Sequence, residues 1–258
     1  MEKSKLNILI TGASRGIGKA LALEFAKYNA QLILIARDEQ KLKESTELLK
    51  SKDISAFYKI CDVTDKEQMK KSVDFAIDKI GSIDIAILNA GVAGSGYFEN
   101  FDSDNLKKIF DVNVFGLANG METLIPVMKK QGYGKIAGVS SLADSRGIPG
   151  NAAYCASKSA TSFILEAARI ELEKYGINII TIKPGFVKSD MTAQNTFYMP
   201  FLMETTVAAK IIVKGILSGK KRIAFPLPLV ILSYLGKTIP AKLFEFFIKK
   251  WRKPINES

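Results

Sequence analysis

Short apolar runs alternate with longer amphipathic stretches along most of this 258-residue chain. The runs are apolar almost throughout, which is typical of parallel strands that are covered on both faces. Six runs predict strands, at Leu6–Ile10, Gln31–Ala36, Ser55–Ile60, Ile83–Leu88, Lys135–Val139 and Asn178–Ile182. Ile223–Phe225 could form a last, short strand.

Between these runs, apolar residues recur at the spacing of amphipathic helices. The predicted helices are Ile17–Tyr28, Glu39–Ser51, Asp65–Ile80, Asp102–Asn113, Val114–Lys130 and Ala152–Tyr175. Regular strand–helix alternation is typical of a parallel sheet joined by right-handed crossovers. We therefore predict an α/β fold: a single doubly wound, Rossmann-type parallel sheet with helices on both faces. One domain over residues 1–258 is expected, with a core at 5–225 and a C-terminal helical extension at 226–258.

The extension differs from the core in charge and pattern. Pro226 and Pro228 argue against one helix through the apolar run that contains them, so a helix is expected from Leu229. From Ile239 to Lys253, apolar and basic residues fall on opposite arcs of a helix. The apolar arc holds Ile239, Leu243, Phe244, Phe246, Phe247, Ile248 and Trp251, and the basic arc holds Lys242, Lys249, Arg252 and Lys253 together with Glu245.

The net charge of +11 is concentrated in this part of the chain. Between Lys214 and Lys253, ten Lys or Arg residues stand against the single acid Glu245. A cationic amphipathic helix could contact an anionic membrane surface, or its apolar face could cover the substrate pocket or a subunit interface. Basic residues without a recognised binding module do not predict a nucleic-acid partner.

Composition narrows the possible chemistry. The chain has no histidine, which excludes Ser-His-Asp and Cys-His catalysis and imidazole zinc sites. Its two cysteines, Cys61 and Cys155, suggest no disulfide framework, and no metal site is predicted. No apolar run reaches the length of a membrane span. We expect a cytoplasmic protein, with peripheral membrane contact as an open alternative.

A glycine-rich turn follows the first predicted strand and precedes a helix. It reads Thr11-Gly12-Ala13-Ser14-Arg15-Gly16-Ile17-Gly18. Glycines in this context let the backbone approach a pyrophosphate, which then lies at the helix N-terminus. The turn predicts a nucleotide cofactor.

The end of the second strand indicates which cofactor. A carboxylate there would bind the ribose 2′-hydroxyl of NAD, but this chain has Ala36 followed by Arg37. Arg15 in the glycine turn supplies a second guanidinium, and two such groups suit the 2′-phosphate of NADP(H). Asp38 is expected to cap the next helix. Asp62, followed by Val63, is placed to meet the adenine.

Tyr154 and Lys158 lie four residues apart on the predicted helix Ala152–Tyr175, so both occupy one face. An ammonium there would stabilise a phenolate and lower the tyrosine pKa into a range useful for general acid–base catalysis. Ser141 could then hydrogen-bond a substrate oxygen. Its neighbour Ser140 should point elsewhere in an extended strand.

Together, these motifs resemble the short-chain dehydrogenase/reductase family over residues 5 to about 190. The matching elements are TGxxxGxG at Thr11–Gly18, Asn89-Ala90-Gly91, Asn113, Ser141, YxxxK at Tyr154–Lys158 and Pro184-Gly185. The resemblance implies hydride transfer between a nicotinamide and a carbonyl or alcohol carbon, in a homodimer or homotetramer.

The resemblance also implies roles for individual residues. Tyr154 would be the general acid–base, Ser141 would hold the carbonyl oxygen, and Lys158 would bind the nicotinamide ribose. Asn113 would anchor a water in a proton relay, and a plain helix-kinking asparagine is the alternative interpretation. The remaining expected cofactor contacts are Thr11, Gly12, Ser14, Arg15, Gly16, Ile17, Gly18, Arg37, Asp62, Val63, Asn89, Ala90, Gly91, Pro184, Gly185, Val187 and Ser189. Ser189 stands where the family commonly has threonine.

Substrate specificity is expected after residue 185. Thr196–Met203 is apolar for a loop, which suits either a wall for a lipid-like or aromatic ketone or a flap on the protein's own surface. The apolar flap and basic tail together look like those of lipid-ketone reductases, including 3-ketosphinganine reductases. The leading hypothesis is an NADPH-dependent reductase of a hydrophobic ketone. The alternatives are an NADP-linked dehydrogenase of steroid-like or other secondary alcohols and a non-catalytic NADP-binding regulator.

Overall fold

The computed structural model describes residues 5–94, 96–193 and 198–251, without the side chains of residues 250 and 251. Its centre is a seven-stranded sheet in the order β3-β2-β1-β4-β5-β6-β7, with every neighbouring pair parallel. The strands are β1 Leu6–Thr11, β2 Ala30–Ala36, β3 Ser55–Ile60, β4 Ile85–Leu88, β5 Gly134–Val139, β6 Ile177–Pro184 and β7 Arg222–Phe225. The predicted doubly wound α/β fold is confirmed.

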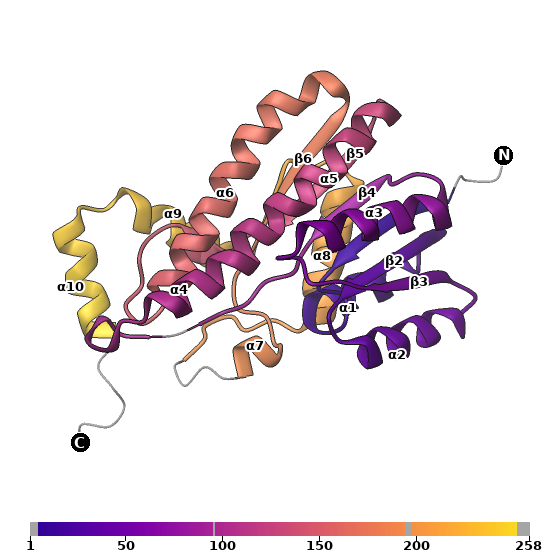
Figure 1. Ribbon diagram of the computed structural model, residues 1–258. Coiled ribbons are helices and arrows are strands. Elements are labelled where there is room, and N and C mark those ends of the chain that lie inside the picture. Colours follow the sequence, from indigo (N-terminus) through magenta and orange to yellow (C-terminus); the bar gives the residue numbers. More distant parts are fainter. Residues whose placement is uncertain (1–4, 95, 194–197, 252–258) are drawn as a thin grey trace.

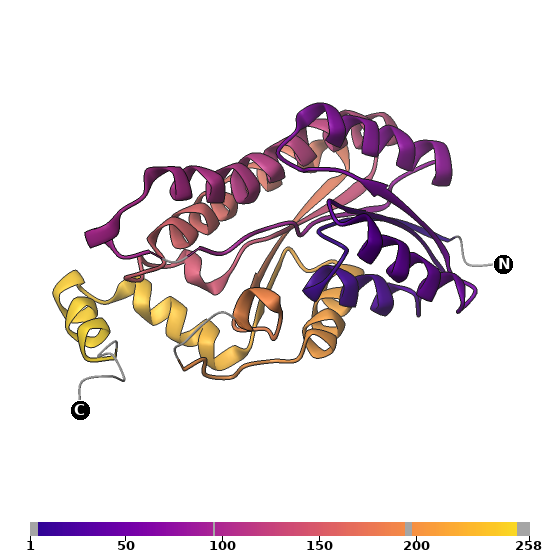
Figure 2. The same cartoon turned by 60° about the horizontal axis from the view of Figure 1, so that its bottom comes forward.

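Helices cover both faces of the sheet (Figures 1 and 2). On one face, the core is built with α1 Gly16–Phe25, α2 Glu39–Lys50 and α8 Thr205–Leu217. On the other, it is built with α3 Lys66–Ile80, α5 Gly116–Gln131 and α6 Ala152–Leu172. Consecutive residues of a strand point to opposite faces. For this reason Ile8, Leu9 and Ile10 are all fully buried, as their apolar run predicted.

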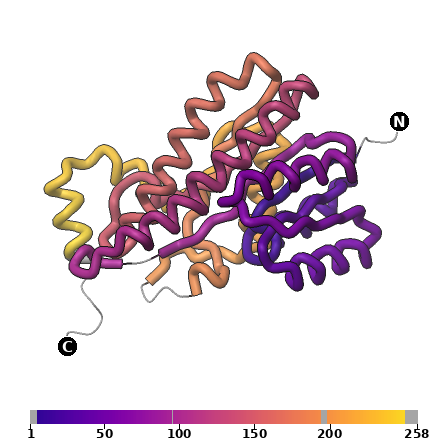
Figure 3. The backbone as a smooth tube through the Cα atoms, in the orientation of Figure 1, coloured from indigo at the N-terminus to yellow at the C-terminus, as the bar shows by residue number. Residues whose placement is uncertain are grey.

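The order of the strands creates a crevice. From β1, the chain adds β2 and β3 on one side and β4 to β7 on the other. At such a switch point the connections leave the sheet in opposite directions, and ligands bind at the carboxyl ends of the strands. Figure 3 traces this path, with the first strands at one end of the molecule and the C-terminal helices at the other. The segments that follow β1, β4, β5 and β6 meet at this edge.

One predicted helix boundary is wrong. Separate helices were expected over Asp102–Asn113 and Val114–Lys130, but α4 Ser103–Phe110 continues into α5 through a π-helical turn at Asp111–Phe115. Such turns insert an extra residue and are common at functional sites. The turn contains Asn113, whose side chain is buried.

Two differences lie in the last third of the chain. No helix was predicted at α8, although its buried residues Ala208, Ala209, Ile212, Val213 and Ile216 follow a clear helical spacing. The predicted start of α9, at Leu229, is two residues too late. This helix spans Leu227–Thr238, because a proline such as Pro228 is tolerated in the first turn, where its missing N–H has no helical partner.

The chain ends, within the described residues, in α10 Ala241–Trp251, which forms inside the predicted amphipathic segment. Arg252 and Lys253 of that segment lie outside the described residues. No helix in the described ranges is long and apolar enough to cross a membrane.

Candidate active site

The glycine-rich turn lies at the carboxyl end of β1, beside β4. Gly12 and Gly16 have φ angles of +65° and +54°, in the left-handed region that favours glycine. A Cβ atom on Gly18 would come within 2.2 Å of the Gly12 carbonyl oxygen, so α1 packs against the turn only with glycine there. No side chain caps the N-terminus of α1 at Arg15. Its first N–H groups therefore suit an anion such as a pyrophosphate.

Asn89 ties this turn to the end of β4. Its side-chain Nδ2 donates to the carbonyl oxygens of Thr11 and Gly12, at 3.0 and 3.3 Å. In return, the Thr11 hydroxyl accepts from the backbone N–H groups of Asn89 and Ala90. The hydrogen bonds of Thr11 and Asn89 thus stabilise the conformation of the turn. Direct contacts of these two residues with a cofactor stay predictions. Ser14 and Val63 are buried, and Ile17 packs against the core.

Gly91 brings the segment after β4 against α6 and the π-helical turn. A Cβ atom at Gly91 would lie 3.1 Å from Asn113 Oδ1 and 3.3 Å from Lys158 Nζ. The Asn113 amide is fully engaged: its Oδ1 accepts from Val92 N, and its Nδ2 donates to Val92 O and Ser157 Oγ. Asn113 therefore fastens this loop to α6, and its role in a proton relay stays a prediction.

Ser141, Tyr154 and Lys158 converge on the same edge. Ser141 follows β5, and its hydroxyl oxygen accepts from Ala143 N at 3.1 Å, while the hydroxyl group is hydrogen-bonded to Tyr154. Lys158 is buried, and its Nζ donates to Val139 O at 2.9 Å and lies 5.8 Å from the centre of the Tyr154 ring. Ser140 points away, as expected, to Lys158 O and Ser162 Oγ.

The expected lowering of the Tyr154 pKa is wrong in direction. Burial raises the pKa of Tyr154, and the hydrogen bond with Ser141 offsets only part of this effect. Burial also lowers the pKa of Lys158 to about 8. The Lys158 Nζ is turned toward the Val139 carbonyl, and desolvation is the largest effect on the pKa of both Tyr154 and Lys158.

A buried polar network that sequence reasoning missed lies behind these residues. The Asp144 carboxylate, in the 3-10 turn Leu142–Asp144, pairs with Lys183 of β6 and accepts from Ser162 Oγ. Ser162 in turn shares a hydrogen bond of 2.8 Å with Ser140. This network joins the Ser141 segment, α6 and β6. No sequence motif predicts this network, because its members are far apart in the sequence.

The end of β6 faces the glycine turn. Gly185 N donates to Phe225 O at 2.7 Å, and a Cβ atom there would lie 2.7 Å from Leu229 Cδ1. Pro184 ends β6, and Val187 is buried with its carbonyl accepting from Thr192. Ser189 lies beside Gly16, where a Cβ atom would approach its Cβ to 3.5 Å. These residues therefore lie at the carboxyl end of β6, on the same side of the sheet as the glycine turn. Their cofactor contacts stay predictions.

The two arginines that suggested a 2′-phosphate are both exposed and both paired with carboxylates. Arg15 lies 3.2 Å from Asp190, and Arg37 lies 3.5 Å from Asp62. Burial acts to raise the pKa of Asp62, but hydrogen bonds from Thr64 and the charge of Arg37 lower it overall. Asp38 caps α2, as predicted, because its carboxylate accepts a hydrogen bond from Lys41 N. That carboxylate is therefore engaged in the helix cap.

The apolar flap is described only from Tyr198 onward; Thr196 and Phe197 lie outside the described residues. The backbone of Met203 is hydrogen-bonded to the segment that follows β6. Lys188 N–H donates to Met203 O, and Met203 N–H donates to Phe186 O. Tyr198 and Phe201, by contrast, expose 75% and 58% of their surface. The end of the flap is thus fixed to the protein, while the side chains of Tyr198 and Phe201 are open to solvent.

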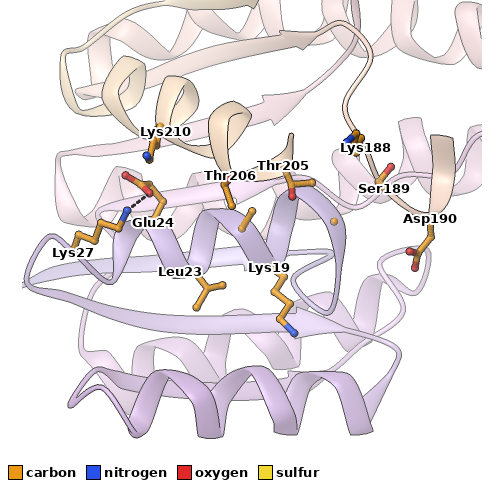
Figure 4. A pocket seen from close by; sticks show the side chains of 12 residues that line it. Lys19, Leu23, Glu24, Lys27, Lys188, Ser189, Asp190, Thr205, Thr206 and Lys210 are labelled. Atoms are coloured by element: carbon orange, nitrogen blue, oxygen red, sulfur yellow. Dashed lines mark hydrogen bonds and ion pairs between the residues drawn. The ribbon is translucent and has the colours of Figure 1, made fainter. Parts of the chain in front are cut away.

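A groove of about 520 Å³ lies between α1 and α8 and reaches Gly16 of the glycine turn (Figure 4). Lys19 and Leu23 come from α1, and Thr205 and Lys210 come from α8. The lining contains none of Ser141, Tyr154 and Lys158. We therefore do not assign this groove to the substrate.

A glycine turn at the switch point of a doubly wound sheet defines a Rossmann-type nucleotide-binding protein. The family model of short chain dehydrogenases matches residues 6–197. The chain therefore belongs to the short chain dehydrogenase/reductase family and is an oxidoreductase of the type that binds a nicotinamide cofactor.

Known relatives agree with this assignment. An uncharacterized oxidoreductase of Myxococcus xanthus is 34% identical over 97% of this chain and 99% of its own length. A 3-oxoacyl-acyl-carrier-protein reductase of Staphylococcus aureus is 31% identical over 74% of this chain and 78% of its own. A short chain dehydrogenase/reductase of Burkholderia phymatum, solved in complex with NAD, shares the fold with a TM-score of 0.83 at 20% identity, covering 100% of this chain and 99% of that one.

Proposed function

We propose that this protein reduces a hydrophobic ketone to a secondary alcohol, with NADPH as the reductant. The observation that carries the proposal is the convergence of Ser141, Tyr154 and Lys158 beside Gly91, at the edge of the sheet where the glycine turn lies. The relative from Staphylococcus aureus is named as a reductase of a 3-oxoacyl group, which is also a ketone on an apolar chain.

When bound, NADPH supplies a hydride to the carbonyl carbon. Tyr154 donates its phenolic proton to the carbonyl oxygen, and its hydrogen bond with Ser141 acts to lower the pKa that burial raises. The Ser141 hydroxyl accepts from Ala143 N and is hydrogen-bonded to Tyr154, and it would donate its proton to the same oxygen once a ketone is bound. Lys158, whose Nζ lies 5.8 Å from the centre of the Tyr154 ring, would bind the nicotinamide ribose. Asn113 keeps the loop containing Gly91 in place.

The residues at the edge of the crevice support a phosphorylated cofactor. Exposed ion pairs such as Arg37–Asp62 contribute little to stability. A phosphate dianion therefore competes well with Asp62 for the Arg37 guanidinium. The second arginine, Arg15, stands at the N-terminus of α1. No acid occupies the end of β2, since Ala36 is there and Asp38 caps α2.

Replacing Arg37 with glutamate should weaken NADPH binding by roughly 10–100-fold, the equivalent of a lost charge-assisted hydrogen bond, and change NADH binding by less than about threefold. Fluorescence titration with each cofactor measures both constants. Lys43→Glu on α2 makes the same change of charge at another exposed position and should leave the ratio unchanged. Equal losses for the two cofactors in Arg37→Glu would remove Arg37 as the 2′-phosphate ligand.

The substrate is expected to be apolar, because exposed Tyr198, Phe201 and Leu202 follow the end of β6. Each buried methylene contributes about 0.8 kcal/mol, so kcat/KM should rise roughly fourfold per carbon until the site is filled. NADPH oxidation measured against ketones graded from short and polar to long-chain tests this expectation. Activity restricted to small or polar carbonyls would rule out a hydrophobic substrate. Faster turnover of NADP with secondary alcohols would favour the dehydrogenase alternative.

We also propose a cytoplasmic homodimer or homotetramer. Exposed apolar side chains on the π-helical turn and α6 support the oligomer: Phe115, Phe163 and Ile170. Phe163 and Ile170 lie seven residues apart, which places them on one face of α6. Light scattering during gel filtration measures the mass directly.

A further inference from the structure

The helices α9 and α10 form a hairpin at one end of the molecule. Figures 1 and 2 both show α10 standing apart from the sheet and from the helix layers that cover it. Among the described residues of the hairpin, the buried apolar side chain is that of Leu229 in α9. The remainder offers surface that the described part of the chain leaves open.

That surface is strongly apolar. Eight large apolar side chains of the hairpin expose 44–69% of their area: Leu227, Ile231, Leu232, Tyr234, Leu235, Leu243, Phe246 and Phe247. On α9, Leu227, Ile231 and Leu235 recur every four residues and so share one face. On α10, the rings of Phe246 and Phe247 are in edge contact at 5.7 Å. Single exposed apolar residues are normal, but a concentration of this kind marks an interaction site.

The same hairpin is positively charged. Lys237, Lys242 and Lys249 are exposed, and none forms an ion pair within the part of the chain that the structure describes. Glu245 is the single acidic residue of the two helices. Lysine stems can lie along an apolar surface while their ammonium groups reach outward to anions.

We propose that the α9–α10 hairpin docks on an anionic lipid surface. Apolar side chains bordered by unpaired lysines match the acyl boundary and the headgroups of such a bilayer. A second copy of this chain fits less well, because a symmetric contact through the hairpin would bring the same positive charges together. A protein partner is also disfavoured, since lysine is depleted in protein interfaces.

The hairpin is fastened to the segment between Ser141 and Tyr154. Arg146 donates from Nε to Gly236 O at 2.7 Å and from Nη2 to Ile239 O at 2.5 Å, and its guanidinium lies 5.1 Å from the centre of the Phe244 ring. Ser233 Oγ donates to Leu142 O at 3.2 Å. A docked hairpin would therefore hold the Ser141 segment near the lipid, where a ketone dissolved in the bilayer could enter. This last step rests on the proposed function, whereas docking itself does not.

Vesicle sedimentation of the full-length protein, without cofactor or substrate, tests the docking. The protein should bind phosphatidylcholine vesicles that contain phosphatidylglycerol at least about tenfold more tightly than pure phosphatidylcholine vesicles, and added salt should weaken the binding. Lys242→Glu/Lys249→Glu and Phe246→Ser/Phe247→Ser should each reduce binding to anionic vesicles by at least about tenfold. The matched control is Lys70→Glu/Lys71→Glu on α3, which makes the same change of charge and should bind within about threefold of the wild type.

The readouts separate docking from catalysis. All variants should keep the melting temperature and the NADPH-dependent turnover of a water-soluble ketone, because none alters the candidate active site. Equal binding to neutral and anionic vesicles, or unchanged binding in the hairpin variants, would overturn the proposal. So would an oligomer that dissociates in Phe246→Ser/Phe247→Ser, since the hairpin would then be a protein interface. Failure of ketone reduction with intact vesicle binding would refute the proposed function alone.

Discussion

Tyr154→Phe should lower kcat for ketone reduction by about 10²–10⁴-fold, the range that a positioned general acid contributes. The substitution removes only the phenolic oxygen and keeps the ring beside Lys158. Binding of NADPH should therefore change by less than about twofold. Stopped-flow measurement of NADPH oxidation, together with a fluorescence titration of the cofactor, separates the two effects.

Tyr175→Phe is the matched control, because Tyr175 lies in the 3-10 turn after α6 and its ring contacts Lys129 and Lys174 instead of the candidate site. It should retain full activity. Turnover in Tyr154→Phe comparable to that of the wild type would show that another group delivers the proton. A loss confined to NADPH affinity would instead make Tyr154 a cofactor ligand.

Local chemistry explains why most of the candidate site could be predicted. The glycine turn is a continuous segment, and Gly12 and Gly16 adopt left-handed φ angles that few other residues accept. Tyr154 and Lys158 share a helix, so four-residue spacing was enough to place them together. The apolar strand runs predicted a parallel sheet because residues such as Ile8 and Leu9 are buried on opposite faces.

The features that could not be predicted depend on contacts between distant segments of the chain or on the burial of side chains. The sequence suggested that Lys158 would lower the Tyr154 pKa, but it contained no information on how far the fold withdraws both groups from water. The π-helical turn at Asn113 forms because the inserted residue lets the amide reach both Val92 and Ser157, two partners outside the helix. The missed helix α8 is different, since its apolar spacing was visible in the sequence.

The Asp144 network leads to the second large effect. Asp144→Ala should lower the free energy of unfolding by about 2–4 kcal/mol, because it leaves the partly buried Lys183 without its counter-charge and Ser162 without its acceptor. Chemical denaturation with urea measures the change. Glu122→Ala removes an exposed partner of Lys66 and should cost less than about 1 kcal/mol, which makes it the matched control.

The double variant Asp144→Ala/Lys183→Met distinguishes a charge effect from a general packing defect. If the cost of Asp144→Ala comes from an uncompensated, partly buried ammonium, removal of Lys183 as well should restore about 1–3 kcal/mol relative to the sum of the single variants. Additive losses would mean that Asp144 acts through packing or through Ser162 alone. Because Ser162 also hydrogen-bonds Ser140, beside Ser141, the single variant should lower kcat more than it raises KM. A network that holds the Ser141 segment, α6 and β6 in register thus links the stability of the sheet edge to the geometry of the proton donor.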